Sequence, residues 1–137
     1  MSQYTIYTDG SYSSARDQGG VGIVVLRDGE KIQDFSKMYK NTTNNKMELM
    51  AVILALSAIK KPIDKLTIVT DSMYVLGCAT KGWKRKKNQD LWKKFDEVYA
   101  KAKSLCKDIN FEWTKGHEDD EWNNFCDKIA VQASQLL

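Results

Sequence analysis

The chain has 137 residues, 42% of them hydrophobic, and a formal net charge of +3. These values are typical of one globular domain with its own core, and they exclude an intrinsically disordered chain. No apolar run of about 18 residues and no secretory-signal pattern is present, so we expect a cytoplasmic protein without a membrane segment. Three cysteines without a CxxC spacing favour reduced thiols over a zinc site or a disulfide framework.

The first forty residues predict three antiparallel strands. Residues 3 to 8 alternate and are rich in β-branched and aromatic side chains, which is typical of a strand. Residues 20 to 26 are apolar almost throughout and predict a second strand. Asp28 and Gly29 form a strong hairpin signal, after which residues 31 to 39 predict a third strand.

The rest of the chain alternates between helices and strands. Residues 45 to 61 predict a helix, because apolar side chains recur there at helical spacing and Pro62 ends the pattern. The further predicted elements are a buried strand at 66–70, a short helix after Asp71, a helix at about 90–105, a strand at 109–113 and a helix at about 122–136. This order predicts an α/β fold with a five-stranded mixed sheet, three antiparallel strands followed by parallel ones, and helices on both faces.

Three acidic side chains are placed where such a fold could bring them together. Asp9 follows the first predicted strand, Asp71 follows the fourth, and Glu48 lies one turn into the first helix. If the two strands are neighbours, all three carboxylates lie at one edge of the sheet, where sites gather in α/β folds. Converging carboxylates bind hard divalent cations and would repel one another without one.

Each of these acids also has an ordinary explanation. Asp9 before Gly10 could be a turn residue, Asn45 and Glu48 have the spacing of a capping box, and Asp71 could be a helix N-cap. The joint occurrence of the three acids at one predicted edge favours the metal site.

Two other residues are ambiguous when taken alone. Asp127 lies off the apolar side of the last helix, where position indicates only an exposed or boundary acid. His117 is the single histidine and lies in a loop, either solvated or able to move protons beside a metal site.

A basic segment follows the fourth strand. Lysines and an arginine surround Trp83, at positions 81, 84, 85, 86 and 87. Such a run is often only a solvated surface, and the tryptophan could belong to the core. The aromatic side chain among the charges favours a surface for nucleic acid.

The motifs YTDGS, TTNNKMELMA, VTDSMYV and KNQDLW, and KGH followed by WNNFCDKIA, resemble the ribonuclease H type 1 family, in that family's order. The match covers essentially the whole chain. It implies a single ribonuclease H catalytic domain over residues 1–137, a metal-dependent endonuclease that cuts the RNA strand of RNA–DNA hybrids and leaves 5′-phosphate and 3′-hydroxyl ends.

The resemblance also implies roles for individual residues. The catalytic acids, which would hold two Mg²⁺ ions with Mn²⁺ as a substitute, fall on Asp9, Glu48, Asp71 and Asp127, with His117 as a loop histidine. The implied substrate-binding residues are Asn44 and Asn45 in a groove, Asn123 near the last acid, Thr43 and Asn88 in a phosphate pocket, and Trp83, Lys84, Arg85 and Lys86 along the DNA strand. The small amides suit recognition of the RNA 2′-hydroxyl. We expect a monomer, and the sequence leaves a partner protein open.

This sequence departs from the family pattern in three places. Asn41 stands where many members have arginine, the segment between Asp71 and Asn88 lacks a longer basic protrusion, and residues 118 to 121 are acidic. Asn41 should weaken a contact to a phosphate of the DNA strand. The short segment predicts either weaker, more salt-sensitive binding of the substrate or assistance by another domain or chain. The alternatives are a hybrid-binding module without activity and a DNA-directed nuclease or integrase on the same fold. The four acids argue against the first alternative, and the TTNN and KGH segments argue against the second.

Overall fold

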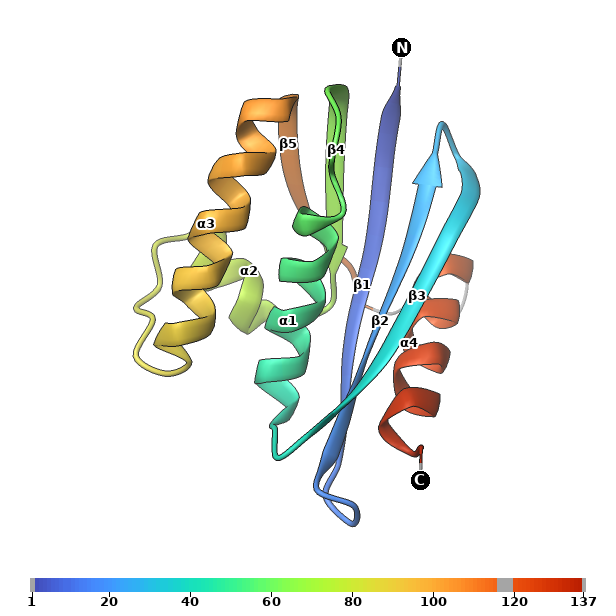
Figure 1. Ribbon diagram of the computed structural model, residues 1–137, viewed down its shortest axis with the longest axis vertical. Helices are drawn as coiled ribbons and strands as arrows, with labels where there is room; N and C mark the ends of the chain where they lie inside the picture. Colours follow the sequence, from blue (N-terminus) through green and yellow to red (C-terminus); the bar gives the residue numbers. More distant parts are fainter. Residues whose placement is uncertain (1, 116–119, 137) are drawn as a thin grey trace.

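The computed structural model describes residues 2–115 and 120–136. The elements in these ranges are β1 (Gln3–Ser13), β2 (Gln18–Arg27), β3 (Glu30–Lys40), α1 (Asn44–Ser57), β4 (Ile63–Thr70), α2 (Met73–Thr80), α3 (Gln89–Leu105), β5 (Cys106–Trp113) and α4 (Glu121–Ser134). The strands form one sheet in the order β3-β2-β1-β4-β5. The first three strands pair antiparallel, and β1-β4 and β4-β5 pair parallel, which confirms the predicted mixed sheet (Figure 1).

Several elements end at different residues from those predicted. β1 continues to Ser13, because its antiparallel pairing with β2 extends as far as Ser13 opposite Gln18. α1 ends at Ser57, well before Pro62, which instead lies directly before β4. The apolar stretch alone did not show where helical hydrogen bonding stops.

Helices cover both faces of the sheet, as predicted. The main core cluster joins α1, α2 and α3 to one face, and its largest fully buried side chains include Trp92 and Phe95. On the other face α4 packs against β1, β2 and β3, around Val24, Leu26 and Cys126. α4 lies very close to β2, since a Cβ atom on Gly20 would clash with the α4 backbone.

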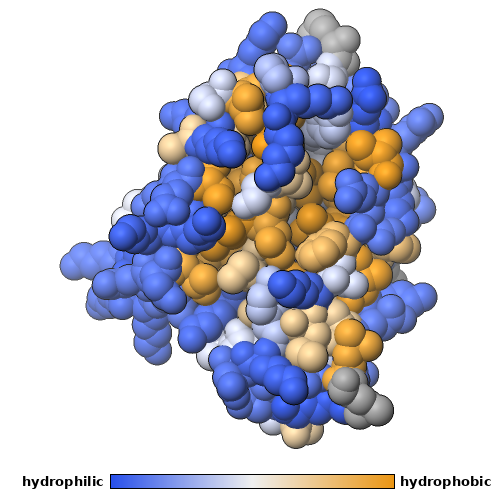
Figure 2. Space-filling view, viewed as in Figure 1, coloured by the Kyte–Doolittle hydropathy of each residue, from blue (hydrophilic) through white to orange (hydrophobic). Residues whose placement is uncertain are grey.

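The surface seen in Figure 2 separates apolar from polar regions. Hydrophobic side chains gather near the centre of this view, and hydrophilic side chains cover the side where α3 and the preceding loop lie (Figures 1 and 2). None of the helices in residues 2–115 and 120–136 is both long enough and apolar enough to cross a membrane.

Candidate metal centre and its surroundings

The pairing of β1 with β4 places Asp9 and Asp71 at the same edge of the sheet. The last residue pair of this parallel ladder is Tyr7 opposite Val69, and each acid follows two residues later. Asp9 is 3% exposed, although a free aspartate side chain in water is charged at neutral pH. Because β1 goes on beyond Asp9 as a partner of β2, Asp9 lies inside a strand and is not the turn residue of the simpler explanation.

Glu48 reaches this edge from the first turns of α1. The N-cap of α1 is Thr43, whose hydroxyl oxygen accepts a hydrogen bond from the Lys46 N–H over 3.2 Å. The capping box suggested for Asn45 and Glu48 is therefore not formed, and the Glu48 carboxylate is free to face β1. There Glu48 Oε1 accepts a hydrogen bond from the Gly10 N–H.

Gly10 lets the helix and the strand approach closely enough for this contact. Its N–H also donates to Asp9 Oδ1 over 2.9 Å, so one backbone group contacts two of the acids. A Cβ atom at this position would overlap the backbone of Met47 and Glu48. The glycine thus determines how near Glu48 can lie to Asp9.

The three acids form a compact group of oxygen ligands. One carboxylate oxygen each from Asp9, Glu48 and Asp71 lies within 4.8 Å of the others. Asp9 Oδ2 and Asp71 Oδ1 are buried and have no hydrogen-bond partner among the described residues. Buried polar atoms normally have a partner, and hard divalent cations prefer carboxylate oxygens. The donor set therefore fits a divalent cation, which would supply the missing partner.

Burial and mutual repulsion raise the pKa of two of these acids. Loss of solvent contributes most to the raised pKa of Asp9, about 8, with repulsion from Asp71 and Asp127 adding to it. Burial likewise raises the pKa of Glu48, together with its contacts to Asp71 and Asp9. Without a cation, this centre holds protons at a pH where isolated carboxylates are ionised.

These pKa shifts predict an unusual dependence of stability on pH. Between pH 5 and 8 the metal-free folded protein should bind more protons than the unfolded chain, whose carboxylates titrate near pH 4. The contribution of this group to the free energy of unfolding should therefore fall as pH rises from 5 to 8, by up to about 4 kcal/mol for each extra proton that the folded protein binds. Urea unfolding of the wild type and of Glu48→Gln, both in chelator, measures the difference.

Saturating divalent cation should remove this pH dependence, because bound carboxylates stay ionised. A difference between wild type and Glu48→Gln that is flat with pH in chelator would contradict the prediction.

Of the other two residues implied by the resemblance, the structure describes Asp127. Asp127 is exposed on α4 and lies beside Asp9, although it is outside the three-acid group. Its neighbour Cys126 fixes that part of α4, since its thiol donates to the Gly22 carbonyl oxygen over 3.0 Å. His117 lies outside the described residues.

The residues proposed for a phosphate pocket and for groove recognition lie together. Thr43, Asn44, Asn45 and Asn88 line one cavity of about 360 Å³, together with Lys87. Asn88 has the left-handed backbone conformation, with φ 60°, and its Nδ2 donates to the Tyr74 hydroxyl over 3.0 Å. This contact fixes the Asn88 side chain at the N-terminal end of α3.

The remaining predicted contacts are spread over two elements. Asn123 is buried in the first turn of α4, where its N–H donates to Asp120. Trp83 is 47% exposed and rests one face on Gly77, so it is neither wholly a core residue nor wholly free. Lys84 and Lys86 are exposed, whereas Arg85 is half-buried against Trp92.

Sequence reasoning missed three residues that lie at these sites. Gly10 was visible only as a turn signal, although its N–H contacts two acids. Trp113 donates from Nε1 to the Asp71 carbonyl oxygen over 3.2 Å, and no pattern in the sequence pairs these positions. Ser72, not Asp71, is the N-cap of α2, which leaves the Asp71 carboxylate for the cluster.

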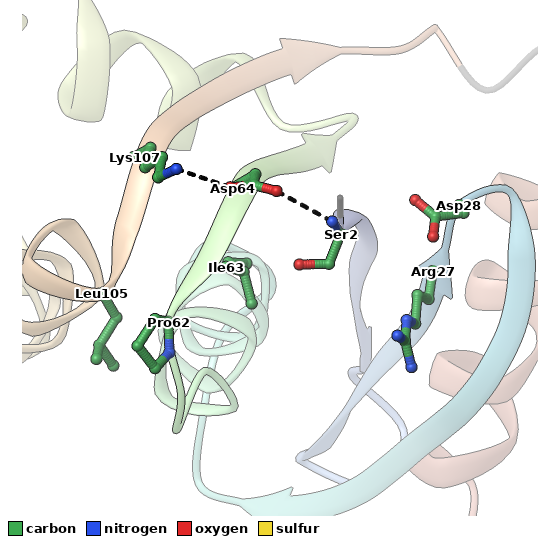
Figure 3. Close-up of a pocket in the computed structure, with 8 residues that line it drawn as sticks. All are labelled: Ser2, Arg27, Asp28, Pro62, Ile63, Asp64, Leu105 and Lys107. Atoms are coloured by element: carbon green, nitrogen blue, oxygen red, sulfur yellow. Dashed lines mark hydrogen bonds and ion pairs between the residues drawn. The ribbon is translucent and has the colours of Figure 1, made fainter.

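A second cavity lies at the opposite end of β1 and β4 (Figure 3). It measures about 610 Å³ and is lined by residues from the start of both strands, the β2–β3 turn and the α3–β5 junction. Asp64 is its central acid and is already paired, accepting from the Ser2 N–H over 3.2 Å and lying 3.3 Å from Lys107 Nζ. None of the three clustered acids lines this cavity, so we assign no part of the metal chemistry to it.

This chain is similar to known proteins over almost its whole length. The family model described as RNase H matches residues 1–135. A Ribonuclease H of Trichodesmium erythraeum is 40% identical, over 98% of this chain and 90% of that protein. A Ribonuclease H of a Thermoanaerobacter species is 38% identical over 93% and 86%, and a Ribonuclease HI of a Synechocystis species is 35% identical over 96% and 87%.

Proposed function

This chain belongs to the ribonuclease H family, and from that premise we propose that it is an endonuclease that hydrolyses the RNA strand of RNA–DNA hybrids. One observation carries the proposal. Asp9, Glu48 and Asp71, far apart in sequence, converge within 4.8 Å, and two of their buried oxygens lack partners among the residues that the structure describes. Buried carboxylates that repel one another destabilise the fold, and a binding module without activity would not need them.

The four acids have distinct places in the proposed chemistry. Asp9, Glu48 and Asp71 would hold divalent cations at the sheet edge. Asp127, which lies beside Asp9 at the surface of α4, would be the fourth carboxylate ligand. We propose two Mg²⁺ ions, with Mn²⁺ as a substitute. When bound, such a pair supplies an activated water and stabilises the departing 3′ oxygen, which leaves 5′-phosphate and 3′-hydroxyl ends.

The amide-rich cavity is the proposed site for recognising the substrate. Asn44 and Asn45 carry donors and acceptors suited to the 2′-hydroxyl and base edges of a minor groove. Thr43, Lys87 and Asn88 line the same cavity, where an ammonium group and neutral donors suit a phosphate of the DNA strand. Trp83, Lys84 and Lys86 would extend this surface.

A panel of substrates tests the proposal. End-labelled RNA–DNA hybrid, double-stranded DNA and double-stranded RNA are each incubated with the protein in Mg²⁺, and the ends of the products are mapped. We expect internal cuts in the RNA of the hybrid alone. Tight binding of the hybrid without cleavage, in Mg²⁺ or Mn²⁺, would instead identify a silent binder, and cleavage of double-stranded DNA would indicate a DNA-directed nuclease.

His117→Ala should slow turnover without abolishing it. A loop histidine that moves protons, or helps the product leave, assists the reaction but does not hold the cations. We expect a fall in kcat of roughly 10²-fold, with the affinity for Mg²⁺ unchanged by calorimetry. Loss of all activity, to the level reached without metal, would show that this role is misassigned.

The protein is expected to act as a monomer in a reducing compartment, the cytoplasm. The three-acid group forms within one chain, and all three cysteines are buried free thiols. Activity in proportion to protein concentration, together with a monomeric mass by light scattering, would support this expectation.

A further inference from the structure

Arg85 differs from the other cations of the basic loop, which comprises residues 81–88 between α2 and α3. Lys84, Lys86 and Lys87 are exposed, whereas Arg85 turns back against the protein. Its guanidinium carbon lies 4.4 Å from the centre of the Trp92 ring. Trp92 is itself buried in the core cluster, so Arg85 links the loop to the body of the fold.

The guanidinium group is held by hydrogen bonds as well as by stacking. Arg85 Nη1 donates to both carboxylate oxygens of Asp96 over 2.9 Å, and Nε donates to the Cys78 carbonyl oxygen over 3.2 Å. These partners lie on α3 and α2 respectively. An ammonium group could not make the same planar set of contacts.

Two neighbouring residues, Trp83 and Lys84, hold the loop in the same place. The Trp83 ring rests on Gly77, where a Cβ atom would clash with it, and the Trp83 N–H donates to the Gly77 carbonyl oxygen over 3.3 Å. The Cys78 thiol donates to the Lys84 carbonyl oxygen over 3.8 Å. The two residues that precede Arg85 are thus attached to α2, and Arg85 connects this segment to Asp96 on α3.

We propose that Arg85 is a positioning residue for polyanion binding. By joining Cys78, Asp96 and Trp92 it holds the basic loop in one conformation, in which Lys84 and Lys86 form a preformed surface for the hybrid's phosphates. Preformed groups bind with less loss of conformational freedom than mobile ones. The inference rests on the proposed function, because the ligand is the RNA–DNA hybrid.

The proposal assigns Asp96 an effect opposite to that expected from its charge. A carboxylate beside a phosphate-binding surface should repel the ligand, so simple electrostatics predicts that Asp96→Asn tightens binding. If Asp96 instead fixes Arg85, the same substitution releases the loop and weakens binding. The two accounts therefore differ in the sign of the change.

The test compares Asp96→Asn with Glu97→Gln, which removes the neighbouring exposed acid of α3. Glu97 lies 3.9 Å from Lys94, and no ion pair within residues 2–115 and 120–136 joins it to the basic loop. Binding of a labelled hybrid is measured by fluorescence anisotropy on an Asp71→Asn background, and KM and kcat are measured on the active chain. We expect Asp96→Asn to raise Kd and KM roughly threefold to tenfold with kcat unchanged, about 0.7–1.4 kcal/mol.

Two further variants distinguish the effect of an ordered loop from the effect of its positive charge. Arg85→Lys keeps the net charge but loses the planar contacts, and it should weaken binding as Asp96→Asn does. Lys84→Ala with Lys86→Ala should weaken binding and flatten its salt dependence, since phosphate contacts are lost. Glu97→Gln should leave Kd unchanged or slightly lower.

Hydrogen exchange reads the order of the loop without the substrate. Amides of residues 83–88 should exchange faster in Asp96→Asn, while those of β1 and α1 keep the wild-type rates. Binding by Asp96→Asn that equals or exceeds wild type, or unchanged exchange in the loop, would overturn the inference. Failure of the wild type to cut the hybrid would overturn the proposed function instead. The exchange rates would still show whether the contact between Arg85 and Asp96 orders the loop.

Discussion

Asp71→Asn should abolish cleavage of the hybrid while making the metal-free protein more stable. The substitution keeps the size of the side chain and removes one charge from a crowded group. A cation held by fewer carboxylates stabilises the transition state less, and a loss of several kcal/mol corresponds to a fall in kcat of roughly 10³-fold or more. Calorimetry should show a parallel loss of Mg²⁺ affinity.

The stability change distinguishes this result from simple unfolding. Asp71 contributes to the raised pKa of both Asp9 and Glu48 by repulsion. Removing that repulsion should increase the free energy of unfolding in chelator by about 1 kcal/mol at pH 7. A site that costs stability when empty is common where function requires like charges to meet.

Asp108→Asn is the matched control. Asp108 is an exposed acid of β5, opposite Lys65 and distant from the cluster in the sheet register. Its substitution should leave cleavage and metal affinity at wild-type values. Substantial cleavage by Asp71→Asn, or a loss of stability in chelator, would remove Asp71 from the proposed centre.

Gly10→Ala should damage the centre through the backbone. The added methyl group must push α1 away from β1, because it would overlap the Met47 and Glu48 backbone. Displacement of reacting groups by about 1 Å costs on the order of 10²-fold in rate, and forced repacking costs roughly 1–3 kcal/mol of stability. We therefore expect weaker metal binding, lower kcat and a lower free energy of unfolding together.

Gly29→Ala provides a control for stability alone. Gly29 lies in the β2–β3 turn at φ +86°, where no described residue would contact the new Cβ atom. The left-handed conformation makes alanine unfavourable there by roughly 1–2 kcal/mol. This variant should lose comparable stability and keep full activity below its unfolding transition. Equal activity in both variants would show that Gly10 does not determine the geometry of Glu48.

Much of the fold could be predicted because local patterns and the core agree. The apolar residues of β4 and the helical spacing in α1 predicted both elements, which the structure confirms and places in the core. Element ends were less predictable. β1 runs five residues beyond its predicted end, because pairing with β2, and not its own composition, decides where it stops.

Local patterns along the chain specify the order of the elements, the acids that follow the strands and, through the motifs, the family. How these acids act together depends on the folded arrangement. Glu48 faces Asp9 because Thr43 caps the helix and because Gly10 has no side chain to keep the helix backbone away. Arg85 packs against the fold because Asp96 and Trp92 lie within contact distance of its guanidinium group. Such contacts depend on distances between residues far apart in the chain, which spacing along one segment cannot specify.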